Sequence, residues 1–287
     1  MSLLNSVNTN MGAMIALQSL NKTNTDLAAA EKQVSTGFRV ADSTDDGATY
    51  AIAQNVRSTV GALTTANQQL GSVQGLLSTT QSGLNDISNL MSSMRDVLTS
   101  LSSGSVTGTA QANYISQYQS LLANVKNDVQ DAAYNGKTLI GSITGSSGTQ
   151  SVMSVVRNEN GAQYTVGTFG GSGLYHSIAY TTAVLQSATQ VRVFIGTSTT
   201  AASFINNSNN VGNELNKIGA SINYVNNQVS YNSDRIDALN GGVGSLVDAD
   251  LAKESAQLQA LQIRQQLGTQ ALSLANQAPQ TLLSLFK

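Results

Sequence analysis

Residues 54–101 read QNVRSTVGALTTANQQLGSVQGLLSTTQSGLNDISNLMSSMRDVLTSL, and this stretch carries a seven-residue repeat. One stripe of the repeat consists of Val56, Leu63, Leu70, Leu77, Leu84, Met91 and Leu98. A second stripe consists of Ala66, Val73, Thr80, Ile87, Met94 and Leu101. Alternating three- and four-residue spacing over this length is typical of a coiled-coil seam. We therefore predict one long helix here that packs against other helices.

Two shorter seams share this spacing. The first consists of Ile115, Tyr118, Leu122, Val125, Val129 and Ala132, and the second of Val211, Leu215, Ile218, Ile222, Val225, Val229, Ile236 and Leu239. We expect Gly241, Gly242 and Gly244 to break the last helix. Three such seams can bury one another, so the sequence predicts an antiparallel helical bundle.

The middle of the chain, residues 141–202, has a different pattern. SVMSVVRNENGAQYTVGTF and TQVRVFIGTSTT alternate β-branched residues around turn signals such as NENG and GGSG. We predict a small β-rich insertion, in which Gly170, Gly171 and Gly173 form a flexible loop tip. The predicted fold class is mainly α, a long coiled-coil bundle built from both termini with this insertion in the middle.

The two ends of the sequence carry weaker apolar stripes. Near the start, Val7 and Met14 are one repeat apart, as are Leu20, Leu27 and Val34. Near the end there are two stripes. The first consists of Leu251, Leu258 and Leu272 and is interrupted by Gln265. The second consists of Val247, Leu261, Ala275 and Leu282 and is interrupted by Glu254 and Gly268. A helix with so weak a stripe needs a partner in water, and the nearest candidate is the other end.

Composition excludes several classes of function. Charged residues are 10% of the chain and the net charge is −2, which gives no field for nucleic acid or an anionic membrane. Because there are no cysteines, disulfides and thiolate chemistry are excluded. No apolar run approaches the ~18 residues of a membrane span, and the first residues lack the pattern of a signal peptide.

Candidate catalytic groups have simpler interpretations. Asp45 and Asp46 are adjacent carboxylates, which we interpret as part of a helix start capped by Ser43 or Thr44. His176 is the only histidine, so it cannot supply a two-histidine zinc site, and no nucleophile motif lies near it. The sequence therefore predicts no catalytic, cofactor-binding or metal-binding residues.

The NGKT motif at residues 135–138 has part of the pattern of a phosphate-binding loop. That pattern requires a glycine at position 131, where this chain has Asp131. We interpret the motif as a turn.

Four stretches of the sequence resemble the bacterial flagellins. They are NSVNTNMGAMIALQSLNKTNTDL at 5–27, STGFRVADSTDDGATYAIAQNVR at 35–57, YNGKTLIG at 134–141 and DADLAKESAQLQALQIRQQLGTQALSLANQAPQTLLSLF at 248–286. One departure is Ser245-Leu246-Val247, where many flagellins have Ser-Arg-Ile. The resemblance implies a structural, non-enzymatic subunit that self-assembles into the flagellar filament for motility.

The resemblance also implies a division into domains. Residues 1–42 and 248–287 would be terminal helices of the filament core (D0), and residues 43–140 and 203–247 a helical bundle outside it (D1). Residues 141–202 would be a short, exposed variable region. The predicted subunit-interface residues are Leu3, Val7, Met14, Leu20, Leu27, Leu251, Leu258, Leu261, Leu272, Leu282, Leu283, Leu285 and Phe286.

Export and partners follow from the same resemblance. The family leaves the cell through the flagellar type III channel without a cleaved signal peptide, which implies an extracellular location in the filament. Implied partners are the chain itself, an export chaperone, and the filament cap and hook-junction proteins. The segment SSMRDVLT at 92–99 resembles the region of flagellins that contacts the innate receptor TLR5. The corresponding residues here are Ser93, Arg95, Asp96 and Val97. Because Ser93 stands where the family pattern has an arginine, we expect weak activation of TLR5.

Two alternatives remain open. The hook–filament junction protein has similar terminal patterns but does not polymerise indefinitely, and the ending ANQAPQTLLSLF favours a filament subunit. An enzyme embedded in a coiled-coil scaffold would need a catalytic constellation, which the sequence does not offer.

Overall fold

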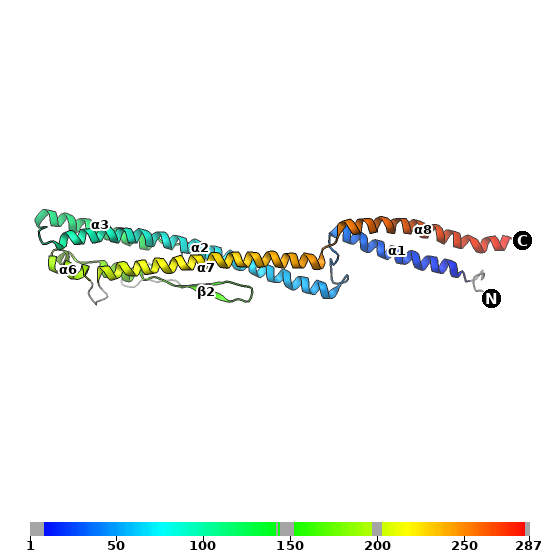
Figure 1. Cartoon of the computed structure of the whole chain (residues 1–287), viewed down its shortest axis with the longest axis horizontal. Coiled ribbons are helices and arrows are strands. Elements are labelled where there is room, and N and C mark those ends of the chain that lie inside the picture. Colours follow the sequence, from blue (N-terminus) through cyan, green and yellow to red (C-terminus); the bar gives the residue numbers. More distant parts are fainter. Residues whose placement is uncertain (1–8, 142, 144–151, 197–202, 285–287) are drawn as a thin grey trace. The chain divides into compact units, whose positions relative to one another are not determined.

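The computed structural model describes residues 9–141, 143, 152–196 and 203–284, with residues 278–284 described by their backbone alone. Helices dominate these residues, as predicted (Figure 1). The chain divides into two compact units, one formed by residues 1–59 and 237–287 and the other by residues 60–236. The first unit therefore combines the two ends of the sequence, and the second is one continuous stretch.

The second unit is built on three long helices: α2 (Gly47–Ser102), α3 (Gly108–Asp131) and α7 (Phe204–Val247). In this unit, every member of the two predicted stripes of α2 from Leu63 to Leu101 is buried. The members of the α3 seam, and those of the α7 seam from Val211 to Val229, join the same core, either buried or packed against it, whereas Ile236 and Leu239 are half-buried outside it. Contacts between α2 and α7 pair rising with falling residue numbers, as in Asn67 with Ser233 and Gln74 with Asn226, so the two helices are antiparallel. The predicted bundle is confirmed.

A two-stranded hairpin follows the helices α2 and α3 in the chain. Strands β1 (Met153–Val156) and β2 (Gln163–Val166) pair in antiparallel fashion around the predicted NENG turn, where Gly161 has a φ of 76°. The Tyr164 ring stacks on Tyr224 of α7 with 4.3 Å between ring centroids. This part of the predicted β-rich insertion is confirmed.

The second predicted β segment is wrong. Its residues 189–195 lie in α6 (Ala188–Ile195), which follows the short helices α4 (Gly171–Ile178) and α5 (Thr182–Leu185), and its residues 197–200 lie outside the described part of the chain. The Ser187 side chain caps α6, and Val191 is buried while Val193 is exposed. Because Val191 and Ile195 are one helical turn apart and both contact the core, helical packing prevails over the β-branched alternation.

The predicted loop tip at Gly170–Gly173 is wrong as well. Gly171 begins α4, is buried, and donates its N–H to the carbonyl of Ile140 at 2.8 Å. A Cβ at this position would lie 2.9 Å from Val129 Cγ1 and 2.8 Å from the Ile140 carbonyl oxygen. Glycine is required here by the close approach of two segments, not by a need for flexibility.

The first unit contains α1 (Met11–Thr36), α8 (Leu251–Ser284), the start of α2 and the end of α7. The expected break at Gly241, Gly242 and Gly244 does not occur, because α7 continues to Val247. Val243 and Val247, one helical turn apart, are buried against Val40 and Ala53. This packing holds the last turns of α7 despite the low helix propensity of glycine. None of the described helices is both long and apolar enough to cross a lipid bilayer.

Candidate assembly surface

The helices α1 and α8 pack against each other along one face, which we call the inner face. Leu27 and Ala30 of α1 and Leu261 of α8 are buried there, and Leu258 packs beside them. The two ends of the sequence are thus partners, as the weak terminal stripes predicted. Three buried residues make a thin core for two long helices, so the pair buries little apolar surface by itself.

Polar and small residues complete the inner face. Asn10 caps α1 through the N–H of Ala13 at 3.1 Å and also donates its side-chain amide to the carbonyl of Ala275 at 2.7 Å. Gln265 Nε2 donates to Asn24 Oδ1 at 2.8 Å. A Cβ on Gly268 would lie 3.2 Å from Leu20 Cδ1, so the missing side chain makes room for Leu20. Two of the three residues that interrupt the terminal stripes, Gln265 and Gly268, are therefore contacts of α8 with α1.

The opposite sides of both helices expose large apolar side chains, and we call these the outer faces. Their members are Met11, Met14, Ile15 and Leu17 on α1, and Ile263, Leu267 and Leu274 on α8. Exposed fractions reach 62% for Ile15 and 73% for Leu274. Ile263, Leu267 and Leu274 recur at helical spacing, so they form a stripe along α8. A row of exposed apolar side chains of this kind is typical of an interaction site.

The predicted interface residues divide between these faces. Met14 and Leu251 are exposed, whereas Leu27 and Leu261 are buried between α1 and α8 and Leu20, Leu258 and Leu272 are half-buried. Leu3, Val7, Leu285 and Phe286 lie outside the described residues, and Leu282 and Leu283 lie where only the backbone is described. The role of the whole set in subunit contacts stays a prediction.

Sequence reasoning missed most of the outer face. Ile15, Leu17, Ile263, Leu267 and Leu274 are among the most exposed large apolar residues of the first unit, and none was predicted as an interface residue. A signal was present, because Ile263, Leu267 and Leu274 follow the helical spacing of four and seven residues. The two heptad stripes that predict pairing of α8 with α1 leave these three residues out, because they lie on the opposite side of the helix.

The segment 37–46, which we call the crossover, connects α1 to α2. Gly37, with a φ of 74°, ends α1 by donating its N–H to the carbonyl of Gln33 at 2.9 Å. Phe38 then forms an antiparallel bridge with Asp248, flanked by a bond from the N–H of Arg39 to the carbonyl of Val247 at 2.7 Å. The crossover is therefore tied to the short link between α7 and α8.

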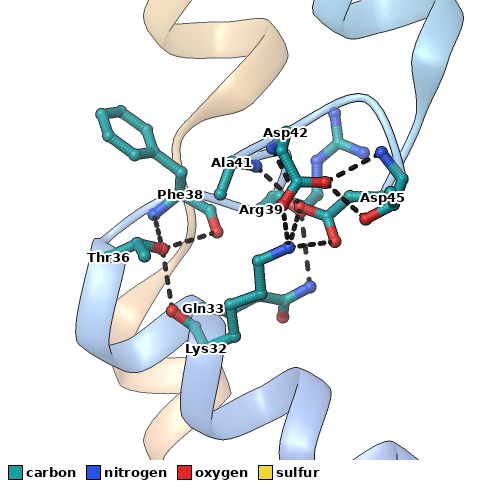
Figure 2. A network of polar contacts seen from close by, with 9 residues as sticks. Lys32, Gln33, Thr36, Phe38, Arg39, Ala41, Asp42 and Asp45 are labelled. Atoms are coloured by element: carbon teal, nitrogen blue, oxygen red, sulfur yellow. Dashed lines mark hydrogen bonds and ion pairs between the residues drawn. The ribbon is translucent and has the colours of Figure 1, made fainter.

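One ammonium group organises the polar side of the crossover (Figure 2). Lys32 Nζ lies 2.7 Å from Asp42 Oδ2 and 2.7 Å from Asp45 Oδ1. Asp45 also accepts from the N–H groups of Ala41 and Asp42 at 2.9 and 3.2 Å. The Arg39 guanidinium donates to the carbonyl of Leu246. These contacts fold the segment around the Lys32 side chain.

The charges of this network alter its pKa values. Hydrogen bonding to Lys32 is the largest cause that lowers the pKa of Asp42 and of Asp45, and the bond to Asp42 is the largest cause that raises the pKa of Lys32. The pKa of Asp46 is also lowered, chiefly by the Thr49 hydroxyl. All these groups are therefore charged at neutral pH.

Asp45 and Asp46 have structural roles. The interpretation of this stretch as a helix start is confirmed, but the expected cap was wrong. Asp46, not Ser43 or Thr44, accepts from the N–H groups of Ala48 and Thr49, both at 3.1 Å, at the start of α2. Asp45 instead binds Lys32, because the crossover turns its carboxylate toward α1.

The remaining candidates also have local partners. His176 Nδ1 lies 2.7 Å from the carbonyl oxygen of Ser172, one turn earlier in α4. The NGKT motif is a turn, as expected, with Asn135 and Gly136 at φ of 50° and 73° between the bridged residues Tyr134 and Lys137. Within the described part of the chain, no three His, Asp or Glu side chains gather where they could hold a metal ion.

The predicted receptor-contact region lies on α2. Ser93, Arg95 and Asp96 are exposed, whereas Val97 is buried with 4% of its surface exposed. Since Val97 belongs to the core of the second unit, only the other three offer side chains to a partner.

Comparisons with known proteins match both halves of the chain. The model of the bacterial flagellin N-terminal helical region matches residues 7–144, and that of the bacterial flagellin C-terminal helical region matches residues 203–286. Flagellin FljM of Caulobacter vibrioides is 35% identical over 99% of each chain. A flagellin of Brucella melitensis is 30% identical over 98% of this chain and 99% of its own.

A solved structure shares the fold. A Vibrio parahaemolyticus protein described as flagellar hook-associated aligns with a TM-score of 0.59 at 16% identity, covering 71% of this chain and all of its own. At this identity the likeness concerns the fold alone.

Proposed function

Because the chain belongs to the bacterial flagellins, we propose that it is the structural subunit of a flagellar filament and that α1 and α8 carry its assembly contacts. The outer apolar faces of α1 and α8 carry this proposal. A head-to-tail contact between unlike surfaces of identical subunits propagates into a helical polymer when the rotation does not close a ring. Covering Ile15 or Leu267 with a neighbour would contribute about 1.5–3 kcal/mol per fully buried side chain.

Residues 1–42 and 248–287 would form the filament core, and residues 43–140 and 203–247 the bundle outside it, with 141–202 exposed. This division differs slightly from the two compact units, whose borders lie at residues 59/60 and 236/237. The difference concerns the start of α2 and the end of α7, which pack with Val40 of the crossover. We propose that this small cluster belongs to the same domain as the terminal helices.

The location and partners belong to the same proposal. The subunit would be exported without a cleaved signal peptide, with the help of an export chaperone, and would meet the filament cap and the hook-junction proteins. We expect no enzymatic activity, no cofactor, and no binding to nucleic acid or membrane. The alternative of a hook–filament junction protein rests on similar terminal patterns and is not favoured, because flagellins match at 35% identity over nearly the full chain.

The assembly contacts can be tested by seeded polymerisation. Leu267→Asp places a carboxylate on the outer face of α8, and burying it unpaired against a neighbour would cost several kcal/mol. We expect the variant to keep the far-ultraviolet circular dichroism of the monomer but to fail to elongate filament seeds in electron micrographs. Gln266→Asp, an exposed polar neighbour, is the matched control and should elongate seeds. Normal elongation by Leu267→Asp would remove the outer face from the proposal.

A further inference from the structure

Each of α1 and α8 has two apolar faces, and their side chains are of similar size. The inner faces contain leucines such as Leu27 and Leu261, while the outer faces contain Met14, Ile15 and Leu267. The hydrophobic effect is non-directional and scales with area, so it does not by itself select which faces meet within one chain. A second kind of interaction has to make that choice.

Polar contacts distinguish the inner faces. Gln265 occupies the same stripe as Leu258 and Leu272, and its half-buried amide donates to Oδ1 of the exposed Asn24 at 2.8 Å. The side chain of Asn10 adds a bond to the carbonyl of Ala275. Both bonds form only when the inner faces meet. In coiled coils, a polar residue at a seam position fixes register and orientation at a cost in stability.

We propose that the Asn24–Gln265 pair selects the faces by which α1 and α8 pair within the chain, and so keeps the outer apolar faces free for a second copy. The proposal rests on the filament function proposed above. Asn24 and Gln265 would be positioning residues for assembly. They would not contact the second copy themselves, but would determine which faces of α1 and α8 remain exposed to it. A pair that merely stabilised the fold would affect the stability of the monomer before its ability to polymerise.

The chain offers a direct reporter of which faces meet. It has no cysteines, so an introduced pair can react only with itself. An ideal Cβ on Gly268 lies 3.9 Å from Leu20 Cβ, which is within the usual Cβ–Cβ range of about 3.5–4.5 Å for a disulfide. Leu20→Cys with Gly268→Cys therefore reports contact between inner faces. Met14→Cys with Leu274→Cys reports contact between outer faces.

The test replaces both amides with apolar residues. In Asn24→Leu/Gln265→Leu the seam becomes more apolar, and removing both partners of a hydrogen bond can be neutral or stabilising. In dilute monomer we expect unchanged or higher helicity, a several-fold lower yield of the 20–268 disulfide, and a 14–274 disulfide that the parent lacks. Seeds should elongate several-fold more slowly. A parent-like yield of the 20–268 disulfide together with parent-like elongation would overturn the proposal.

Charged pairs keep the test decisive if the double-leucine variant loses helicity. Asn24→Asp/Gln265→Lys restores an attractive polar contact, and we expect parent-like disulfide yield and elongation. Asn24→Asp/Gln265→Glu places like charges in contact, and both readouts should fall. Equal behaviour of the two variants would overturn the proposal. If the parent itself did not elongate seeds, the filament function would fail, while the disulfide yields in the monomer would still decide the selection of faces.

Discussion

The Lys32 side chain shows how one group can organise a connection between helices. Its ammonium neutralises Asp42 and Asp45, whose carboxylates would otherwise repel each other in a short turn. In the folded crossover, Val40 is buried against Val243 and Val247. A polar contact at the surface thus fixes where a buried apolar side chain lies.

Replacing Lys32 should weaken this connection in a pH-dependent way. The lowered pKa values of Asp42 and Asp45 give stability that is full above their ordinary value of 3.8 and is lost as pH falls below it. The raised pKa of Lys32 gives stability that is full below its ordinary value of 10.5 and is lost as pH rises above it. We expect Lys32→Met to lower the thermal midpoint between these limits and to match the parent at lower pH.

Thermal unfolding followed by circular dichroism at several pH values measures this effect. Lys32→Arg keeps a cation that can reach both carboxylates and should behave nearly as the parent does. A constant difference between Lys32→Met and the parent at every pH would show that the effect comes from packing of the side chain, not from its charge.

Ser93 is the residue on which recognition by TLR5 should depend. It lies exposed on α2 near Arg95, at the position where the resemblance expects an arginine. An arginine there restores a forked donor, and about 1.4 kcal/mol of added binding energy corresponds to a tenfold gain in affinity. We expect Ser93→Arg to raise potency in a reporter-cell assay by about tenfold or more. Ser92→Arg, on the adjacent exposed position, is the control and should change little.

Among the elements, the long helices were the most predictable. The α2 stripes repeat without interruption, and the side chains from Leu63 to Leu101 lie where that repeat places them. The α6 segment was not predictable in the same way, because Val191, Val193 and Ile195 fit both a strand and a helix in isolation. Contacts with distant residues decide such a case, as Arg192 Nε shows by donating to the carbonyl of Ser102 at 2.8 Å.

The assembly surface shows the same limit. The inner face of α8 could be found from its heptad stripe, but the roles of Gln265 and Gly268 depend on Asn24 and Leu20, far away in the sequence. The sequence pattern marked both residues as interruptions. Only the pairing of α1 with α8 turns them into contacts.

Two glycines in helices should respond to substitution in opposite ways. Gly241 of α7 has no atom within 4 Å of an added Cβ, so Gly241→Ala should stabilise the monomer by up to about 1 kcal/mol. Gly171 at the start of α4 has the Ile140 carbonyl oxygen 2.8 Å from an added Cβ. Gly171→Ala should therefore destabilise it by about 1–3 kcal/mol, the usual cost of overpacking. Urea titration of both variants measures the two signs, and a gain for Gly171→Ala would contradict the packing described here.

The chain as a unit of assembly combines two parts that bury very different amounts of apolar surface. The unit of residues 60–236 has a continuous core drawn from α2, α3, α7 and the segments between them. Among the side chains that the structure describes, the pair of α1 and α8 has three buried residues and two exposed apolar faces. A part with so thin a core gains most from neighbours, so polymerisation and stabilisation of the terminal helices should occur together.

Removing residues 279–287 should separate folding from assembly. This segment contributes Leu282, Leu283, Leu285 and Phe286, and at about 1.5–3 kcal/mol per fully buried side chain their loss would remove several kcal/mol per subunit from the filament. Among the side chains that the structure describes, those buried between α1 and α8 are Leu27, Ala30 and Leu261, so the circular dichroism of the monomer should change little. The truncated chain should fail to elongate seeds in electron micrographs.

Removing Lys287 alone is the matched control and should leave elongation intact. Leu70→Asp should instead unfold the monomer, because Leu70 is fully buried in the other unit. Filaments of normal length and stability from the truncated chain would show that the segment takes no part in assembly, and that the outer faces of α1 and α8 suffice.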